Sequence, residues 1–213
     1  MEKRTIILLG GSGGLGSQLT EIFNRDYTVL SMSSKDCDVT GYSNIVRSGV
    51  DYVVNCAGWN YDDVIHKASD IHIRRMIDIN CFGAVNVIRE YVKYFREQKK
   101  PGKIVMMSSF LSIRPERGAG IYCASKSFID TITKVAAIEN AKHGILINSV
   151  QCGFMNGGMT NRLPVGMKES LPNIIPVGRI GEVEELADAI KFLLNNDYVT
   201  GTNLVIDGGV SLI

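Results

Sequence analysis

Short apolar segments with the length of β-strands recur along the chain. They occupy residues 5–9, 27–32, 51–55, 103–108, 145–150 and 202–207. Their apolar residues follow one another directly instead of alternating with polar ones, which is typical of parallel strands buried on both faces. Helical patterns lie between them, at residues 15–24, 71–98, 122–143 and 182–195. This alternation predicts right-handed βαβ units, and hence a doubly wound α/β fold with a parallel sheet and helices on both faces.

The chain shows no repeat, linker or low-complexity tract that would divide it. Its length of 213 residues suits one domain, so we predict a single domain over residues 1–213. The longest irregular stretch is residues 153–181, which is rich in Gly, Pro and Asn. Because loops of that length in a compact domain are usually functional, we predict that this stretch forms a lid or substrate wall.

Charge and cysteine content narrow the class of partner and the compartment. The formal net charge is +1, which gives no reason to expect nucleic acid or an anionic membrane, and we expect a small-molecule ligand. The cysteines are scattered without a C-x-x-C pair, and neither they nor the histidines have metal-ligand spacing. No apolar run reaches membrane-spanning length, and the first is too short for a signal peptide. The sequence therefore predicts a soluble, cytoplasmic protein without a metal site.

The segment GGSGGLG, residues 10–16, follows the first predicted strand and leads directly into a predicted helix. Glycines at such a turn let the backbone approach a pyrophosphate, and the first N–H groups of the helix bind its charge. The segment fits G-x-G-x-x-G from Gly11 and G-x-x-x-G-x-G from Gly10. A structural turn is the alternative, but the position between strand and helix favours a dinucleotide site. The residues expected to form it are Gly10, Ser12, Gly13, Gly14, Leu15 and Gly16.

The residues after the second predicted strand bear on the choice of cofactor. An acid about twenty residues after the glycine loop usually holds the ribose of NAD. The sequence there is SMSSKD, with Ser33 and Ser34 at the expected ribose positions and Lys35 beside them. Because no carboxylate stands at these positions to repel a 2′-phosphate, the sequence weakly favours NADP(H) over NAD(H).

Tyr122 and Lys126 stand four residues apart in a predicted helix, and therefore on one face of it. A nearby ammonium lowers the pKa of a phenol, which would make Tyr122 an acid–base catalyst for an alcohol oxygen. The alternative is an accidental pair on a solvated face. Two residues favour catalysis: Ser109 follows a predicted strand at its carboxyl end, and Asn80 interrupts an apolar helix, where an amide needs a specific partner.

Further motifs, together with these residues, resemble the short-chain dehydrogenase/reductase family and in particular its 3-oxoacyl-[acyl-carrier-protein] reductases. The motifs are the glycine loop, NCAG at residues 55–58, YCASK at 122–126, IPVGRIGEVEELA at 175–187 and YVTGTNLVIDGG at 198–209. The resemblance spans essentially the whole chain. It implies a Rossmann-type fold and an NAD(P)-dependent oxidoreductase.

The resemblance also implies a role for each matching residue. Tyr122 would be the acid–base group, Lys126 would lower its pKa and hold the nicotinamide ribose, and Ser109 would bond the substrate carbonyl. Asn80 would position a water molecule beside Lys126. The further cofactor contacts that the resemblance implies are Asp38, Val39, Asn55, Ala57, Gly58, Gly153 and Met155.

The chain also departs from the family's pattern. Residues 32–38 form so short a connection that a helix and most of a strand are expected to be missing. Cys152 replaces the proline of a Pro-Gly pair, and Gly157 replaces the threonine that meets the nicotinamide carboxamide. We expect Asn156 or Thr160 to substitute for that threonine.

The motifs predict an enzyme that transfers a hydride between nicotinamide and a carbonyl or secondary alcohol, with a carrier-linked 3-oxoacyl thioester as the foremost substrate. The alternatives are a reductase of another ketone or polyol and a non-catalytic regulator that binds the dinucleotide. REQKK at residues 96–100 and Arg162 correspond to carrier-docking regions, although a solvated helix end explains the first equally well. Extra apolar faces on helices 71–98 and 121–142 predict a homo-oligomer, either a dimer or a tetramer.

Overall fold

The computed structural model describes residues 3–41 and 48–213. Its centre is a six-stranded sheet in the order β2-β1-β3-β4-β5-β6, in which all neighbouring strands are parallel. The strands are β1 (Thr5–Leu9), β2 (Thr28–Met32), β3 (Tyr52–Asn55), β4 (Gly102–Ser109), β5 (Ile145–Cys152) and β6 (Asn203–Ile206). Every predicted strand is therefore confirmed.

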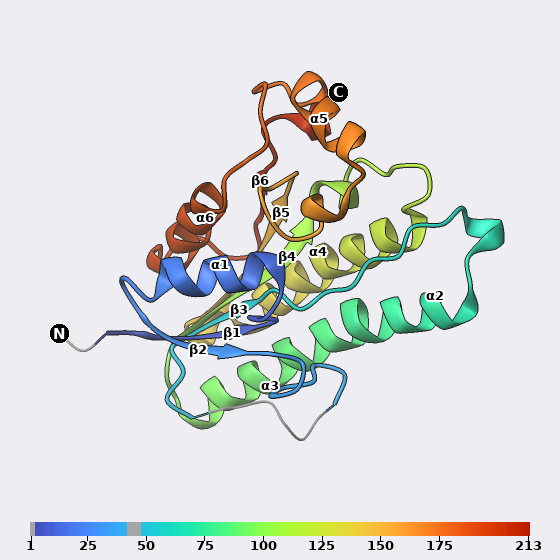
Figure 1. Cartoon of the computed structure of the whole chain (residues 1–213). Coiled ribbons are helices and arrows are strands. Elements are labelled where there is room, and N and C mark those ends of the chain that lie inside the picture. Colours follow the sequence, from blue (N-terminus) through green and yellow to red (C-terminus); the bar gives the residue numbers. More distant parts are fainter. Residues whose placement is uncertain (1–2, 42–47) are drawn as a thin grey trace.

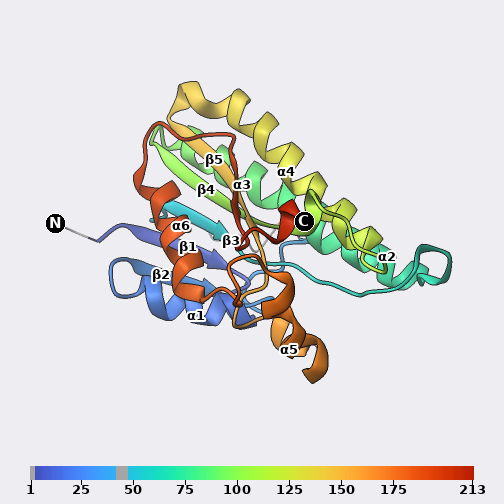
Figure 2. The ribbon, with the colours of Figure 1, turned by 90° about the horizontal axis from the view of Figure 1, so that it is seen from above.

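Helices cover both faces of the sheet (Figure 1, Figure 2). The covering helices are α1 (Gly14–Phe23) and α6 (Val183–Asn195) on one face, and α3 (Gly83–Glu97) and α4 (Gly120–Asn140) on the other. In β1, Ile6 and Leu8 pack in the core beneath α1 and α6. Their neighbours Ile7 and Leu9 point the other way and pack in the core beneath α3 and α4. The predicted doubly wound Rossmann-type fold is confirmed.

The predicted helix 71–98 is divided into α2 (Asp70–Met76), a π-helical turn (Ile77–Phe82) and α3. A π-helical turn inserts a wider turn into a helix and often marks a functional site. This one contains Asn80, which is 1% exposed. The sequence predicted the helix and the unusual amide, but its apolar periodicity gave no sign of the change in helical type.

The region 153–181 was predicted to be irregular, and this is wrong in part. It contains the helix α5 (Val165–Ile174), which begins directly after Pro164. Leu171 and Ile175 pack in a small core with Phe110 and Val210. The sequence did not predict this helix because Gly166 and Pro172 are both unfavourable inside helices. Tertiary packing overrides that preference here.

The shortened connection after β2 leaves β2 at one edge of the sheet. Among the described residues between β2 and β3 there is neither helix nor strand, as the short spacing predicted. The short helical turns elsewhere are Ile65–Lys67, Phe110–Ser112 (η3), Ala141–His143, Thr160–Arg162 and Val210–Leu212. Over the described ranges, no helix has both the length and the apolar character that a membrane span requires.

Candidate active site

The carboxyl edge of the sheet brings the predicted site segments together. β1 leads into the glycine loop at this edge, β4 ends at Ser109 and β5 ends at Cys152. Ser109 and Cys152 are partners in the register of β4 and β5. Ligands of open α/β sheets bind at this edge, so the candidate site lies where the fold class places it.

Tyr122 and Lys126 of α4 lie beside the end of β4. Both are buried, with exposed fractions of 8% and 4%. The Lys126 ammonium donates a hydrogen bond to the Met107 carbonyl oxygen (2.9 Å) and lies 5.5 Å from the centroid of the Tyr122 ring. The Ser109 hydroxyl lies near Tyr122 and acts to lower the pKa of the phenol. The structure thus brings the predicted serine, tyrosine and lysine to one place.

Burial raises the pKa of Tyr122 well above its ordinary value, and the nearby Cys152 thiol adds to the rise. The Ser109 hydroxyl acts in the opposite direction without cancelling it. The sequence predicted a lowered pKa from the neighbouring Lys126, and this is wrong for the protein alone. The reason is the exclusion of water, which disfavours the phenolate more than the surrounding groups favour it. Tyr122 is therefore protonated at neutral pH.

Asn80 joins the π-helical turn to the loop after β3. Its Oδ1 accepts from the Trp59 N–H (2.8 Å), and its Nδ2 donates to the Trp59 carbonyl oxygen (2.9 Å) and to Ser125 Oγ (3.0 Å). These are the specific partners that the sequence predicted for a buried amide. The water that Asn80 was expected to position stays a prediction. Gly58 lies so close that a Cβ there would be 3.5 Å from Lys126 Nζ.

The glycine loop has a backbone geometry that fits a dinucleotide. Gly10 has φ +77°, which favours glycine, and a Cβ there would lie 2.7 Å from Ala57 N. A Cβ at Gly16 would collide with the Gly10 carbonyl oxygen. Gly13 caps α1 without a side-chain hydrogen bond, so the first N–H groups of the helix are left to a phosphate. The residues present can therefore hold a pyrophosphate.

The turn after β2 contains a carboxylate that the sequence prediction missed. Asp36 Oδ2 accepts from the Ser33 hydroxyl (2.6 Å) and from the Ser33 N–H (2.9 Å). These bonds lower the pKa of Asp36, so its carboxylate is ionised at the end of β2. The prediction that no carboxylate stands here is wrong, because the turn folds Asp36 back over Ser33. The Ser-x-x-Asp spacing of a polar turn was the available signal.

Asp38 and Val39 lie farther along the same turn. The Asp38 carboxylate accepts from the Thr40 hydroxyl (2.9 Å) and the Thr40 N–H (3.0 Å). Val39 is buried, and its carbonyl oxygen accepts from Asn86 Nδ2 (2.9 Å). These contacts fix the turn against α3. The adenine contacts predicted for Asp38 and Val39 stay predictions.

A groove of about 810 Å³ separates this turn from α2 and the π-helical turn. Ser34 and Asp38 line one side of it, and Arg74, Arg75 and Asp78 line the other. The Arg75 guanidinium lies 4.7 Å from the centroid of the Trp59 ring, whereas Arg74 has no ion-pair partner in the described ranges. The groove therefore offers a cation and a hydroxyl at the edge where an adenine nucleotide would lie.

The loop after β5 borders the glycine loop. Gly153 follows β5 directly, and Met155 is buried and forms a parallel bridge with Gly181. A Cβ on Gly14 would lie 2.6 Å from the Gly158 Cα, so the two backbones touch. The predicted substrate loop and the predicted cofactor loop are thus in direct contact.

Two side chains were expected to replace the missing carboxamide-binding threonine. Asn156 Nδ2 donates to the Glu182 carboxylate (3.2 Å), which directs it toward α6. Thr160 is buried, with 7% of its surface exposed. Gly157 packs against Gln18 of α1. Whether either side chain meets the carboxamide stays a prediction.

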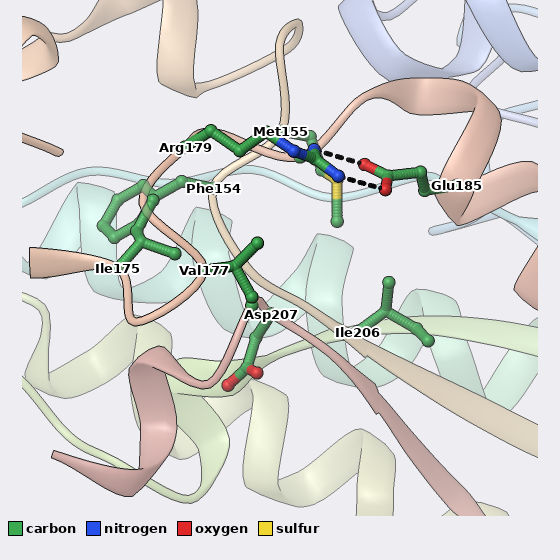
Figure 3. Close-up of a pocket in the computed structure, with 10 residues that line it drawn as sticks. Phe154, Met155, Ile175, Val177, Arg179, Glu185, Ile206 and Asp207 are labelled. Atoms are coloured by element: carbon green, nitrogen blue, oxygen red, sulfur yellow. Dashed lines mark hydrogen bonds and ion pairs between the residues drawn. The ribbon is translucent and has the colours of Figure 1, made fainter. Parts of the chain in front are cut away.

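A cavity of about 120 Å³ lies behind this loop (Figure 3). Phe154 and Met155 line it, and Figure 3 shows the Arg179 guanidinium aligned with the Glu185 carboxylate at its rim. The two hydrogen bonds of this ion pair measure 2.6 and 2.8 Å. The cavity contains none of the predicted catalytic residues, so we assign it to the packing of the loop against α6 and not to catalysis.

Known proteins similar to this chain agree with this fold. A family model described as enoyl-(acyl carrier protein) reductase matches residues 42–211. Carbonyl reductase family member 4 of Xenopus tropicalis is 31% identical over 233 aligned residues, which cover 96% of this chain and 97% of that protein. The 3-oxoacyl-[acyl-carrier-protein] reductase FabG of Thermotoga maritima is 36% identical over 189 residues, covering 87% and 76%. The solved structure "ElxO with NADP Bound" has a TM-score of 0.88 at 24% identity and covers 99% and 100%.

These similarities place the chain among the oxidoreductases that use a nicotinamide dinucleotide. Within that class, it belongs to the short-chain dehydrogenase/reductase family, because the family model and the relatives cover most of its length. Members of this family are NAD(P)-dependent and act on carbonyl and alcohol groups. The family resemblance and the enzyme class predicted from the sequence are therefore confirmed.

Proposed function

We propose that this protein reduces the carbonyl group of a 3-oxoacyl thioester with NADPH. The observation that carries the proposal is the buried, protonated phenol of Tyr122 beside Ser109 and Lys126. A protonated phenol can give its proton to a carbonyl oxygen that is being reduced, whereas a phenolate would have to take one from an alcohol. At neutral pH the phenol of Tyr122 is therefore in the protonated state that reduction of a carbonyl requires.

The proposed roles follow from what each side chain can donate. The Ser109 hydroxyl donates a hydrogen bond to the substrate oxygen as negative charge develops on it, and Tyr122 then gives that oxygen its proton. The Lys126 ammonium offsets the charge left on Tyr122. A nicotinamide dinucleotide would supply the hydride when bound. Asn80 holds the loop of Gly58 against this group.

The substrate class is supported by the relatives. Several are 3-oxoacyl-[acyl-carrier-protein] reductases, including one of Rickettsia typhi that is 29% identical over 99% of this chain. Residues 153–181, which border the site through Gly158, would form the substrate wall. A reductase of another ketone is the second candidate, since carbonyl reductase family member 4 is similar over 96% of the chain.

The preference for NADP(H) is supported by two features and opposed by one. Neighbouring solved structures contain bound NADP, and Arg74 with Lys35 offers positive charge near Ser34. The ionised Asp36 carboxylate at the end of β2 opposes a 2′-phosphate. Arg74 and Lys35 thus favour binding of a 2′-phosphate, whereas Asp36 at the same edge of the sheet disfavours it.

We further propose a homo-oligomer in the cytoplasm that accepts a carrier-linked substrate. For carrier docking, Arg96, Lys99 and Arg162 are the available cations, since the Lys100 ammonium lies 3.4 Å from the Asp51 carboxylate. The described cysteines are all free thiols, which suits a reducing compartment. Comparing a carrier-linked 3-oxoacyl substrate with the same acyl group on coenzyme A would measure what the carrier adds.

The test of the proposed function is Tyr122→Phe, which removes only the phenolic hydroxyl. With acetoacetyl-coenzyme A and NADPH, we expect kcat to fall by at least about 100-fold, because the proton donor is lost. NADPH affinity, measured by fluorescence titration, should change by less than about tenfold. Tyr198→Phe, at a tyrosine that is 99% exposed, is the matched control and should leave both unchanged. If Tyr122→Phe retained most of its kcat, the proposed mechanism would be excluded.

A further inference from the structure

α4 contains a buried carboxylate one helical turn after Lys126. Asp130 is 6% exposed, and its Oδ1 accepts from Ser149 Oγ (2.9 Å). Its Oδ2 accepts from Gln151 Nε2 (2.6 Å). Both donors are neutral and lie in β5. Burying a carboxylate is costly unless other groups offset its charge, and none of the roles proposed so far uses Asp130.

The groups that face Lys126 come from four elements. Asp130 and Tyr122 lie on α4, Cys56 follows β3, Cys81 lies in the π-helical turn and Cys152 ends β5. Burial raises the pKa of Cys56 to about 12, and it also raises the pKa values of the Cys81 and Cys152 thiols and of the Tyr122 phenol. These four groups are therefore neutral at physiological pH.

Among the groups named here that act on Lys126, Asp130 is then the carboxylate. Burial lowers the pKa of Lys126, and Asp130 acts in the opposite direction. No direct ion pair joins the two side chains, because the Lys126 ammonium bonds the Met107 carbonyl oxygen. Their spacing of four residues keeps them on one face of α4, and water is excluded from both, so the attraction is only weakly screened.

Asp130 is also linked, through Gln151, to the turn that follows Ser109. Gln151 Nε2, which donates to Asp130, donates its other hydrogen to Ser112 Oγ (2.9 Å) in η3. Ser109 Oγ accepts from the Leu111 N–H of the same turn (3.2 Å). Asp130 is thus connected through Gln151 to the turn whose Leu111 N–H bonds the serine proposed to bind the substrate.

We propose that Asp130 is a positioning residue that keeps Lys126 charged and, through Gln151, fixes the turn beside Ser109. This proposal rests on the proposed function in one respect only: the proposed function is what gives the charge of Lys126 a role in catalysis. The pairing of the two charges is a property of the folded chain alone.

The first test is a double-mutant cycle on stability, which needs no substrate. Asp130→Asn and Lys126→Met should each lower the melting temperature, since each leaves a buried charge without its counterpart. The double variant should lose less than the sum of the two, and it should be more stable than Asp130→Asn. If Asp130→Asn does not fold, the double variant should recover folding. Additive losses, or a double variant less stable than Asp130→Asn, would overturn the pairing.

The second test is the pH dependence of kcat/KM. Lys126 must be protonated to offset charge on Tyr122, so activity should fall as pH rises through the pKa of Lys126. In Asp130→Asn this decline should begin about one to two pH units lower, because the supporting charge is gone. Asp130→Glu keeps the charge and should keep the wild-type pH range even if kcat falls. Asp188→Asn, at an exposed aspartate of α6, is the control.

If Asp130 had a merely structural role, Asp130→Asn would lower kcat at every pH, and kcat/KM would begin to fall at the same pH as in the wild type. That result would overturn the proposal. If the wild-type protein reduces no 3-oxoacyl thioester, the proposed function fails. The stability cycle would still decide whether Asp130 and Lys126 are paired.

Discussion

The Asp36 carboxylate sets the charge at the end of β2. It is held by two hydrogen bonds from Ser33 and is ionised. A 2′-phosphate bound near Ser34 would meet this negative charge, whereas the free ribose hydroxyls of NAD(H) could donate to it. One exposed side chain therefore acts against the cofactor preference predicted from Ser33, Ser34 and Lys35.

Replacing Asp36 with asparagine should shift the cofactor preference toward NADPH. Asparagine keeps an oxygen that Ser33 can bond, but it removes the charge that repels the phosphate. We expect the ratio of NADH to NADPH dissociation constants to rise by roughly tenfold, a shift typical of one partly screened like charge. Fluorescence titration of the two cofactors measures the ratio. Asp188→Asn removes an equal charge from an exposed position of α6, and an equal shift in both variants would contradict the prediction.

At the residue scale, the sequence predicted which side chains lie close together, but it did not predict how the folded protein shifts their pKa values. The spacing of Tyr122 and Lys126 fixes them on one helix face, and this was readable from the chain. The pKa of Tyr122 depends on burial and on Cys152, which comes from a strand thirty residues later. Such contributions arise only when the sheet brings distant segments together, and local sequence contains no record of them.

At the element scale, α6 is tied to the preceding segment by the Arg179–Glu185 ion pair. Glu185 also accepts from the Glu182 N–H (2.8 Å), which completes a capping box at the start of α6. The hydrogen bond from Arg179 is the main cause that lowers the pKa of Glu185 to about 2, from an ordinary value of 4.5. Because the folded-state pKa is the lower one, ionised Glu185 stabilises the fold above pH 4.5.

Glu185→Gln should therefore destabilise the protein in a pH-dependent way. Glutamine can still accept from Glu182, so the capping bond remains while the charge is lost. At neutral pH we expect a loss of less than about 1 kcal/mol, since the ion pair is half exposed and screened by solvent. The difference from wild type should shrink as the pH falls from 4.5 toward about 2, where the wild-type carboxylate becomes protonated. Urea denaturation at several pH values measures it.

Glu184→Gln is the matched control for this prediction, since Glu184 lies exposed in the same first turn of α6. It should show a smaller loss at neutral pH. A destabilisation by Glu185→Gln that stayed constant down to acid pH would show that the charge of Glu185 contributes nothing.

Elements were predictable where one physical signal dominated. The strands were predicted correctly because short, unbroken apolar runs bounded by turn residues are typical of buried strands. The helix α5 was missed because Gly166 and Pro172 are unfavourable inside helices, and its formation is explained by the burial of Leu171 in the small core around Phe110. The π-helical turn was missed for a different reason. The wider turn contains Asn80, which forms two hydrogen bonds with Trp59. These bonds cannot be predicted from helical periodicity alone.

At the scale of the whole molecule, α4 exposes several large apolar side chains on its outer face. Val135 and Ile138 are 50% and 81% exposed, and Phe128 is 37% exposed on the same helix. Figure 2 shows α4 along the outside of the sheet. Exposed apolar side chains that gather on one helix are typical of a subunit interface. This face is where we place the contact of the predicted homo-oligomer.

Ile138→Glu should therefore separate subunits without unfolding them. A glutamate at the centre of an apolar contact would be desolvated without a partner, which costs several kcal/mol and raises the dissociation constant by at least about 100-fold. Light scattering after size exclusion should show a lower mass than wild type at the same concentration, with an unchanged circular dichroism spectrum. Tyr198→Glu adds the same charge at a side chain that is 99% exposed and should leave the mass unchanged. If the wild-type protein is monomeric, or if Ile138→Glu keeps its mass, α4 does not form the interface. The apolar face would then have to be explained by a partner other than a second copy.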